Sequence, residues 1–159
     1  MIFVTLGTQQ IPFTRIMQML DELVIKEHIQ DEIIVQAGYT DYETKNFKCI
    51  KFLKEDEFQE YIAKATVIIT HAGSGALFSS IKSGKKVIAV ARLSKYGEMI
   101  DDHQTELTRK LAEEGYILDG TNSIIDTWKK IDDFIPRKND FACSIPEVLE
   151  SIFTNKKIT

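Results

Sequence analysis

The sequence lacks the features that mark several common classes of protein. No stretch approaches the roughly 20 apolar residues that cross a bilayer, and the first ten residues contain no basic segment of the kind found in secretory signals. Asp and Glu outnumber Lys and Arg, and the net charge is −4, so there is no excess of positive charge for nucleic acid. We therefore expect a cytoplasmic protein that binds no nucleic acid.

Cysteine and proline are also scarce. The two cysteines, Cys49 and Cys143, are far apart and neither belongs to a metal-binding pair, so we expect reduced, partly buried thiols. The chain has only three prolines, no repeat and no low-complexity tract, and it is 43% apolar, which favours a folded protein. A length of 159 residues suits one domain and is too short for two ordinary ones.

Apolar runs of strand length alternate with segments of helical period along the chain. The predicted strands span residues 2–6, 32–37, 66–70, 86–91 and 115–119, with a shorter one within 47–53. The predicted helices span about 12–26, 55–65, 75–82, 101–114, 123–133 and 146–154. Strands that are apolar on both faces indicate a parallel sheet covered on both sides. We therefore predict a single α/β domain over residues 1–159, Rossmann-like and doubly wound, with a mostly parallel sheet.

Sheets of this kind bind ligands in the loops beyond the carboxyl ends of their strands. Residues 71–75, HAGSG, follow a predicted strand and open a helix. Gly73 and Gly75 have no Cβ to obstruct an anion, and the free amides and dipole of the helix attract one. His71 and Ser74 would add donors. The pattern indicates a phosphate or diphosphate site.

A second loop repeats the arrangement. Residues 6–8, LGT, also lie between a predicted strand and a helix, with Gly7 as the turn and Thr8 as a hydroxyl donor or helix cap. The alternative for both loops is that the glycines only make tight turns, and the recurrence of the pattern favours the phosphate site.

Other chemistries fit the sequence less well. There is no P-loop motif, and the dinucleotide pattern G-x-G-x-x-G would need glycine at Phe78. Ser74 has glycine on both sides, unlike the G-x-S-x-G motif of hydrolases, although Ser74 as a nucleophile with His71 or His103 as base remains an alternative. Those two histidines and Asp101 are thin evidence for a metal site. We expect no metal and no cofactor.

The loop after the strand at 86–91 is unusually long and polar, which favours function over a plain connection. Arg92 directly follows the buried strand and either pairs with a phosphate or makes a surface ion pair. The side chains that follow suit sugar hydroxyls or the edge of a pyrophosphate: Glu98, Asp101, Asp102, His103 and Gln104. The alternative is that the two aspartates cap the next helix and the others face water.

Together these motifs resemble a known family. LGT, QAGY at 36–39, HAGSG and GEMIDDHQ at 97–104 are similar to the nucleotide-sugar-binding half of GT-B glycosyltransferases. Within these, the sequence resembles the family 28 C-terminal domain of the peptidoglycan and dolichol-linked N-acetylglucosaminyltransferases. It is most similar to the small subunits of two-chain bacterial capsule and exopolysaccharide glycosyltransferases. The resemblance covers about residues 1–120.

The resemblance implies roles for individual residues. Gly7 and Thr8 would face the donor, and His103 and Gln104 would contact the hydroxyls of its sugar. The residues that would hold the diphosphate of a UDP-sugar are His71, Gly73, Ser74 and Gly75. Many relatives bind the ribose with a glutamate in the helix after the glycine loop, and Ser79 stands at that position in this sequence. How the nucleoside is held is therefore not explained by the resemblance.

The resemblance also implies a partner. In these enzymes the acceptor site, and usually the catalytic base, lies on an N-terminal domain that the 159 residues do not include. We therefore expect a glycosyltransferase subunit that works with a membrane-anchored partner at the inner face of the membrane. The expected reaction transfers a hexose from a UDP-sugar to a polyprenyl-diphosphate-linked saccharide with inversion. The alternative is a non-catalytic nucleotide-sugar-binding or regulatory module.

The predicted helix at 146–154 and the residue before it carry an apolar stripe at helical spacing. Its members are Ile145, Val148, Leu149, Ile152 and Phe153. Such a stripe either docks on the partner or packs against the chain's own sheet.

Overall fold

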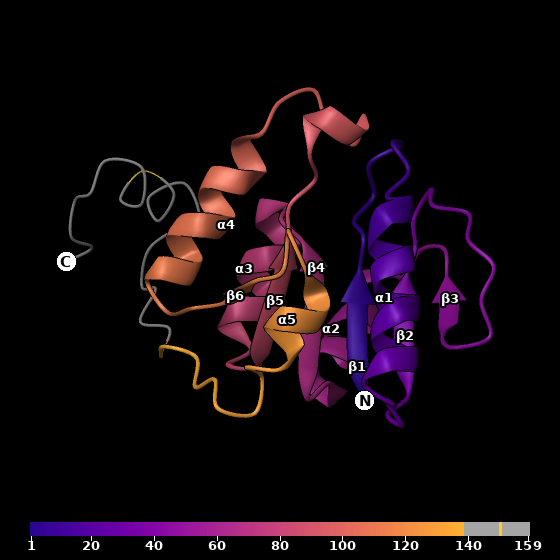
Figure 1. Ribbon diagram of the computed structural model, residues 1–159, viewed down its shortest axis with the longest axis horizontal. Coiled ribbons are helices and arrows are strands. Elements are labelled where there is room, and N and C mark those ends of the chain that lie inside the picture. Colours follow the sequence, from indigo (N-terminus) through magenta and orange to yellow (C-terminus); the bar gives the residue numbers. More distant parts are fainter. Residues whose placement is uncertain (139–149, 151–159) are drawn as a thin grey trace.

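The computed structural model describes residues 1–138 and residue 150. These residues form one six-stranded sheet in which all neighbouring strands are parallel, with helices on both faces (Figure 1). The prediction of a Rossmann-like, doubly wound α/β fold is confirmed. Apart from residue 150, the predicted helix at 146–154 with its apolar stripe, and Cys143, lie outside the described residues.

Strands and helices follow one another in the predicted order, with no helix between β2 and β3. The strands are β1 (Ile2–Thr5), β2 (Ile33–Gln36), β3 (Lys48–Ile50), β4 (Val67–His71), β5 (Lys86–Val90) and β6 (Leu118–Asp119). The helices are α1 (Thr14–Lys26), α2 (Glu55–Lys64), α3 (Ser74–Lys82), α4 (His103–Glu113) and α5 (Ile124–Trp128), with a 3-10 turn, η1 (Ser94–Tyr96), before α4. Within residues 1–138, each helix is too short or too polar to reach across a bilayer.

Two elements late in the chain are shorter than predicted. β6 begins only at Leu118, because the preceding residues still complete the end of α4, where the Tyr116 amide donates to the Leu111 carbonyl at 3.1 Å. After Trp128 the backbone closes tighter turns, with the Ile131 amide donating to the Trp128 carbonyl at 2.9 Å. These turns end α5 earlier than the apolar pattern indicates.

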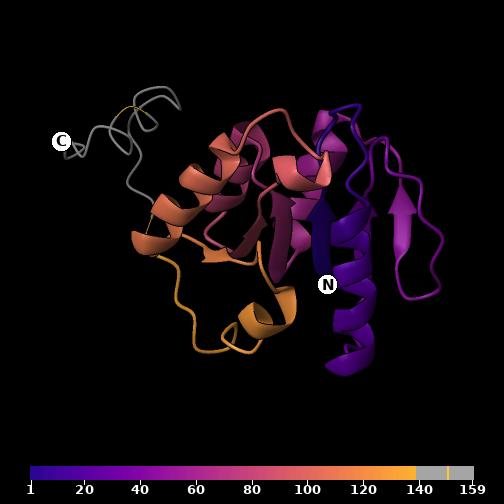
Figure 2. The ribbon, with the colours of Figure 1, turned by 45° about the horizontal axis from the view of Figure 1, so that its top comes forward.

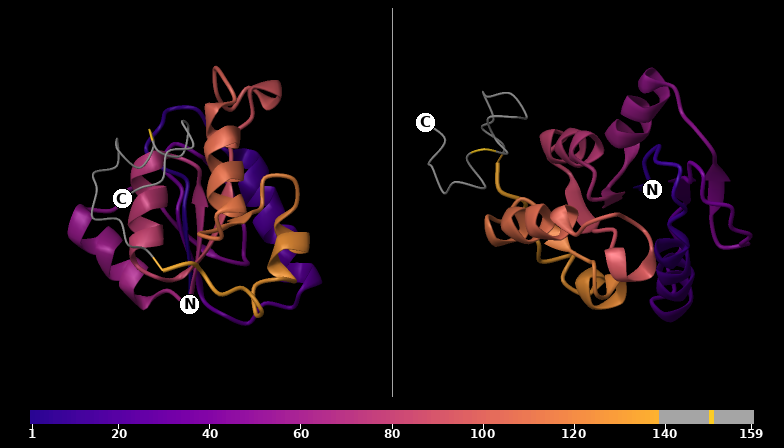
Figure 3. Two further views of the ribbon diagram at one scale, coloured as in Figure 1. Left: turned by 90° about the vertical axis from the view of Figure 1, so that its left-hand side faces the viewer. Right: turned by 90° about the horizontal axis from the view of Figure 1, so that it is seen from above.

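Side chains of the central strands alternate between two apolar cores. Val4 and Ile69 pack on one face with α1 and α5, while Phe3 and Ile68 pack on the other with α2, α3 and α4. All four side chains are completely buried. The view from above in Figure 3 shows α1 and α5 on one side of the sheet and α2 and α3 on the other. Burial on both faces explains why the strands are continuous apolar runs.

The strand order β3-β2-β1-β4-β5-β6 reverses at the centre of the sheet. The chain builds outward from β1 through β2 and β3, and β4 then begins the second half on the other side of β1. The loop after β1 leads to α1 on one face, and the loop after β4 leads to α3 on the opposite face. Open α/β sheets place their ligands where two such loops diverge, which is the upper edge of the sheet in Figure 1.

β3 is an edge strand of three residues, and both Lys48 and Cys49 are exposed on it. Cys49 is therefore more exposed than expected, although partial burial still raises the pKa of its free thiol. The reason is its place in the sheet, because the two cores lie mainly over the more central strands.

Gly38 follows β2 and lies against the loop after β1. Its φ is +57°, and a Cβ there would lie 2.5 Å from the Gly7 carbonyl oxygen. Gly84 has a similar φ of +71°, but its Cβ would meet nothing within 4 Å. We expect Gly84→Ala to lower the free energy of unfolding by about 1 kcal/mol through backbone strain alone. Gly38→Ala should lower it by about 3 kcal/mol or more, because the two loops must also separate.

Urea denaturation of the two variants beside the unmodified chain measures this difference. Equal losses for the two alanine substitutions would show that the loops after β1 and β2 do not press against each other.

Candidate functional site

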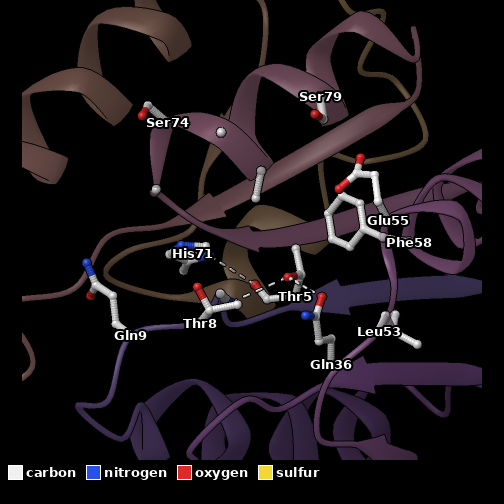
Figure 4. Close-up of a pocket in the computed structure, with 14 residues that line it drawn as sticks. Thr5, Thr8, Gln9, Gln36, Leu53, Glu55, Phe58, His71, Ser74 and Ser79 are labelled. Atoms are coloured by element: carbon white, nitrogen blue, oxygen red, sulfur yellow. Dashed lines mark hydrogen bonds between the residues drawn. The ribbon is translucent and has the colours of Figure 1, made fainter.

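A cavity of about 620 Å³ lies beyond the carboxyl ends of the central strands (Figure 4). Its walls come from the loops after β1 and β4, the end of β2, the segment that enters α2, and the first turns of α3. The lining residues are Thr5, Gly7, Thr8, Gln9, Gln36, Leu53, Glu55, Phe58, His71, Gly73, Ser74, Gly75, Ala76 and Ser79. The cavity therefore occupies the point where the strand order reverses.

Six of the ten residues predicted to bind substrate line this cavity. They are Gly7, Thr8, His71, Gly73, Ser74 and Gly75. The two predicted glycine loops, which follow the neighbouring strands β1 and β4, thus lie together at this cavity. They are more than sixty residues apart in the sequence. Ser79, which the resemblance places at the position of a ribose-binding glutamate, also lines the cavity.

His71 is the last residue of β4 and is only 6% exposed. Its Nδ1 lies 3.3 Å from the carbonyl oxygen of Thr5. Because a carbonyl can only accept, Nδ1 carries the proton and Nε2 keeps its lone pair. Burial lowers the pKa of His71 to about 4; the Thr5 carbonyl opposes this shift and the charge of Arg92 adds to it. At neutral pH the ring is therefore neutral, with Nε2 as an acceptor.

This tautomer changes the role predicted for His71. The neutral ring already donates its one N–H to Thr5, so it has no second N–H for a phosphate oxygen. To donate to a diphosphate, Nε2 must first take up a proton. An anion bound beside the ring would favour that uptake, because a nearby negative charge stabilises the imidazolium form.

Two of the predicted glycines make room for the His71 ring. A Cβ on Gly73 would overlap Nε2, and one on Gly7 would lie 2.5 Å from the same atom. Gly75 differs, because a Cβ there would meet no atom within 4 Å. Gly7 and Gly73 therefore accommodate the histidine, and only Gly75 borders open space.

The first turn of α3 forms one wall of the cavity. Gly73 is the N-cap residue and supplies no side-chain hydrogen bond to the turn, so the first amides of the helix keep their donor capacity. Gly73, Ser74, Gly75 and Ala76 all line the cavity. The positive end of the nine-residue helix, with free amides, is an environment that binds phosphate groups.

Gln36 is a lining residue that sequence reasoning missed. It ends β2 and is 5% exposed, and its Oε1 accepts from the Thr5 hydroxyl at 3.2 Å. The signal was present, because Gln36 is a polar residue at the carboxyl end of an apolar strand. Leu53, Glu55 and Phe58 were missed too, and no local pattern marked them.

Arg92 lies outside the cavity, contrary to expectation. It is 1% exposed, and its guanidinium donates to the carbonyls of Ile11 at 2.7 Å, Leu6 at 3.2 Å and Glu98 at 3.3 Å. The guanidinium also lies 4.7 Å from the centre of the Phe13 ring. Arg92 therefore holds the loop after β1 against the loop after β5, which lie side by side in Figure 2.

Glu98 is likewise an internal residue. It is 5% exposed and forms a two-point ion pair with Arg15, at 2.8 and 2.9 Å. It also accepts from the Leu93 amide at 2.9 Å. Arg15 in turn donates to the carbonyls of Ala91 and Thr121, at 2.7 and 2.8 Å. The predicted ligand contact of Glu98 is replaced by a link between α1 and the loop after β5.

The two remaining predicted residues also lie outside the cavity lining. Gln104 is 8% exposed, and its Oε1 accepts from the Arg92 amide at 3.2 Å. The His103 side chain is 84% exposed, with Nε2 3.8 Å from Asp101 Oδ2. Asp101 also accepts from the His103 amide at 3.1 Å, but the N-cap residue, Asp102, makes no side-chain capping hydrogen bond. Asp102 instead binds the amide and hydroxyl of Ser94, at 2.8 and 3.0 Å.

The hydrolase alternative finds no support in the geometry. Ser74 is exposed at the start of α3, and no hydrogen bond joins it to either His71 or His103 in the part of the chain that is described. Figure 4 shows Ser74 and His71 apart. Among residues 1–138, no group of three His, Cys, Asp or Glu side chains is arranged to hold a metal ion.

One family model matches most of the chain. The glycosyltransferase family 28 C-terminal domain matches residues 1–140. The mouse protein named UDP-N-acetylglucosamine transferase subunit ALG13 is 26% identical in an alignment of 131 residues that covers 72% of this chain and 10% of the mouse protein. The Candida glabrata protein of the same name is 26% identical over 135 residues, 80% of this chain and 64% of that protein. The match thus takes up less than two thirds of either relative.

A solved structure shows the same fold. The solution NMR structure of ALG13 superposes with a TM-score of 0.60 at 16% sequence identity, covering 98% of this chain and 95% of that chain. At this identity the likeness speaks for the architecture alone.

The buried histidine makes stability depend on pH. The unfolded state binds a proton at His71 near the ordinary pKa of 6.5, whereas the folded state does so only near 4. Between these values the unfolded state holds more protons, so stability falls as the pH is lowered. We expect the free energy of unfolding to lose about 3 kcal/mol between pH 7 and pH 4 through this group.

Urea titrations of the unmodified chain and of His71→Asn across this range measure the effect as a difference between the two curves. Other groups titrate in both proteins and cancel. If the two curves run parallel, the burial of a neutral His71 is not the cause.

The ion pair between Arg15 and Glu98 has a matched control. The two side chains are 18% and 6% exposed, so Glu98→Gln leaves a mostly buried guanidinium without its counter-charge and should cost about 3 kcal/mol of unfolding free energy. The Arg109–Glu113 pair is 55% and 62% exposed, and Glu113→Gln should cost at most about 0.5 kcal/mol. Thermal and urea denaturation measure both. Similar losses would refute a stabilising role for the buried pair.

Proposed function

The chain belongs to the family of glycosyltransferase family 28 C-terminal domains, and on this premise we propose that it binds a UDP-sugar as one subunit of a heteromeric, inverting glycosyltransferase. One observation carries the proposal: a cavity at the point where the strand order reverses, with the uncapped first turn of α3 as one wall. A diphosphate needs such a wall of free amides and positive dipole. Thr8 and Ser74, which also line the cavity, supply hydroxyl donors.

In this arrangement, recognition of the donor centres on its diphosphate. Its diphosphate lies at the first turn of α3, and the protonated form of His71 donates to it through Nε2. The same groups stabilise the charge that develops on UDP as the sugar leaves. This chain thereby positions the donor and its leaving group.

The acceptor site and the catalytic base belong, in our proposal, to a membrane-anchored partner subunit. An acceptor hydroxyl attacks the anomeric carbon of the hexose, the bond from that carbon to the diphosphate oxygen breaks, and UDP leaves with the bonding electrons. The hydroxyl proton passes to the base on the partner. The configuration at the anomeric carbon inverts, because attack comes from the face opposite the leaving group.

The acceptor we propose is a polyprenyl-diphosphate-linked saccharide in capsule or exopolysaccharide synthesis. The support is the similarity of the sequence motifs to small subunits of such enzymes. A partner that holds a lipid-linked acceptor would keep this chain at the inner face of the membrane. The curated relatives are named as transferase subunits for UDP-N-acetylglucosamine, so this sugar nucleotide is the first donor to test, beside UDP-glucose and UDP-galactose.

Calorimetric titration of the purified chain with UDP and these UDP-sugars tests the proposal directly. Binding of UDP by the chain alone and hexose transfer only when the partner is present are the expected results. Absence of UDP binding and of partner-dependent transfer would refute it. Binding without transfer would instead favour the alternative of a non-catalytic binding module.

A substitution at Gly75 can weaken ligand binding without lowering the free energy of unfolding. Alanine is favoured over glycine in helices by about 1 kcal/mol, and a Cβ at Gly75 meets no atom within 4 Å, so Gly75→Ala should not lower the free energy of unfolding. The methyl group would nevertheless occupy space beside the first turn of α3, and we expect UDP to bind at least about tenfold more weakly.

Gly84→Ala, at a glycine that does not line the cavity, serves as the control and should bind UDP like the unmodified chain. Unchanged affinity in Gly75→Ala would place the diphosphate away from α3.

A further inference from the structure

The cavity has a second end that differs chemically from the first turn of α3. Leu53 lines it from the segment before α2, Glu55 and Phe58 line it from α2, and Ser79 lines it from α3 (Figure 4). In Figure 4 these four side chains lie away from His71 and Ser74, with Glu55 and Phe58 next to each other. One end of the cavity thus offers free amides and the other a carboxylate, a hydroxyl and an apolar surface.

Glu55 has a free carboxylate oxygen. Its Oε1 accepts from the Gln59 side-chain amide at 2.8 Å, and no hydrogen bond or ion pair to Oε2 occurs within the described residues. The N-terminal cap of α2 does not need this side chain, because Glu57 accepts from the Lys54 amide at 2.8 Å. Glu55 is therefore available to a ligand in the cavity.

The two ends impose one orientation on a nucleoside diphosphate. The Glu55 carboxylate repels phosphate groups, whereas the positive end of α3 attracts them. A carboxylate is an acceptor with two oxygens, and a ribose offers two neighbouring hydroxyls that donate. The ribose hydroxyls therefore suit the Glu55 end, and the Ser79 hydroxyl faces the same end from the opposite wall.

Phe58 supplies a flat apolar surface beside this acid. Its ring is held edge-to-face against Phe3, with ring centres 5.5 Å apart, and Phe3 also stacks on Tyr61 at 5.4 Å. Phe3 is completely buried, so the Phe58 ring is anchored to the core while another part of it lines the cavity with Leu53. A nucleobase can pack on such a surface.

We propose that Glu55 accepts hydrogen bonds from the 2′ and 3′ hydroxyls of the donor's ribose and that Phe58 packs against its base. Glu55 from α2 then provides the acid that Ser79 does not provide from α3. The proposal rests on the proposed function, since it assumes that the cavity takes a nucleoside diphosphate. It makes Glu55 a specificity residue that selects ribonucleotides over 2′-deoxyribonucleotides.

The experiment compares the affinities of three probes: UDP, 2′-deoxy-UDP and inorganic pyrophosphate. The unmodified chain should bind UDP roughly tenfold more tightly than 2′-deoxy-UDP, because one hydrogen bond to a charged acceptor is lost. Glu55→Ala should bind UDP roughly tenfold more weakly and lose this preference, while its affinity for pyrophosphate stays the same or rises. Asp56→Asn is the matched control, because Asp56 is an exposed acid of the same turn that does not line the cavity.

Phe58→Leu provides a second readout that does not depend on the acid. It should weaken UDP severalfold and leave pyrophosphate unchanged, and thermal denaturation checks that the core around Phe3 is intact. If Glu55→Ala prefers UDP over 2′-deoxy-UDP as strongly as the unmodified chain does, the role proposed for Glu55 is overturned. If the unmodified chain binds neither UDP nor pyrophosphate, the proposed function itself is overturned, so the two failures are distinguishable.

Discussion

The hydrogen bond from His71 to the carbonyl of Thr5 is the contact on which the rest of the site depends. It joins the carboxyl ends of β1 and β4, where the strand order reverses. The ring it holds leaves no room for a Cβ at Gly7 or Gly73, so one side chain accounts for a glycine in each of the two loops. Because the ring is buried and neutral, an anionic ligand bound beside it would favour the uptake of a proton by the ring.

A second constraint comes from the buried guanidinium of Arg92. Its two Nη atoms donate to three carbonyl groups, from residues 6, 11 and 98, while its buried Nε has no hydrogen-bond partner among the described residues; a buried charge without such carbonyls would be costly. The ion pair between Arg15 and Glu98 adds a further link between α1 and the loop after β5. Polar residues that looked like ligands in the sequence are thus part of the framework that brings the loops beside the cavity.

Local pattern was enough to predict the parallel sheet and the two glycine loops, because continuous apolar strands and a glycine-rich start of a helix have only a few structural explanations. It gave no sign of the internal bonds of Arg92 and Glu98, because the partners of these residues lie up to 86 residues away. It also missed Glu55 and Phe58, whose approach to α3 depends on the packing of Phe58 on Phe3. Gln36 could have been predicted from the sequence, since it is a polar residue at the end of an otherwise apolar strand.

The internal bonds of the loop after β5 bear on the order of events at the site. Arg92 ties that loop to the loop after β1, Glu98 ties it to α1, and Gln104 holds it from the start of α4. Folding has therefore already met the entropic cost of ordering it, and a ligand does not have to. Whatever the cavity binds therefore meets a neighbouring loop that is already in place.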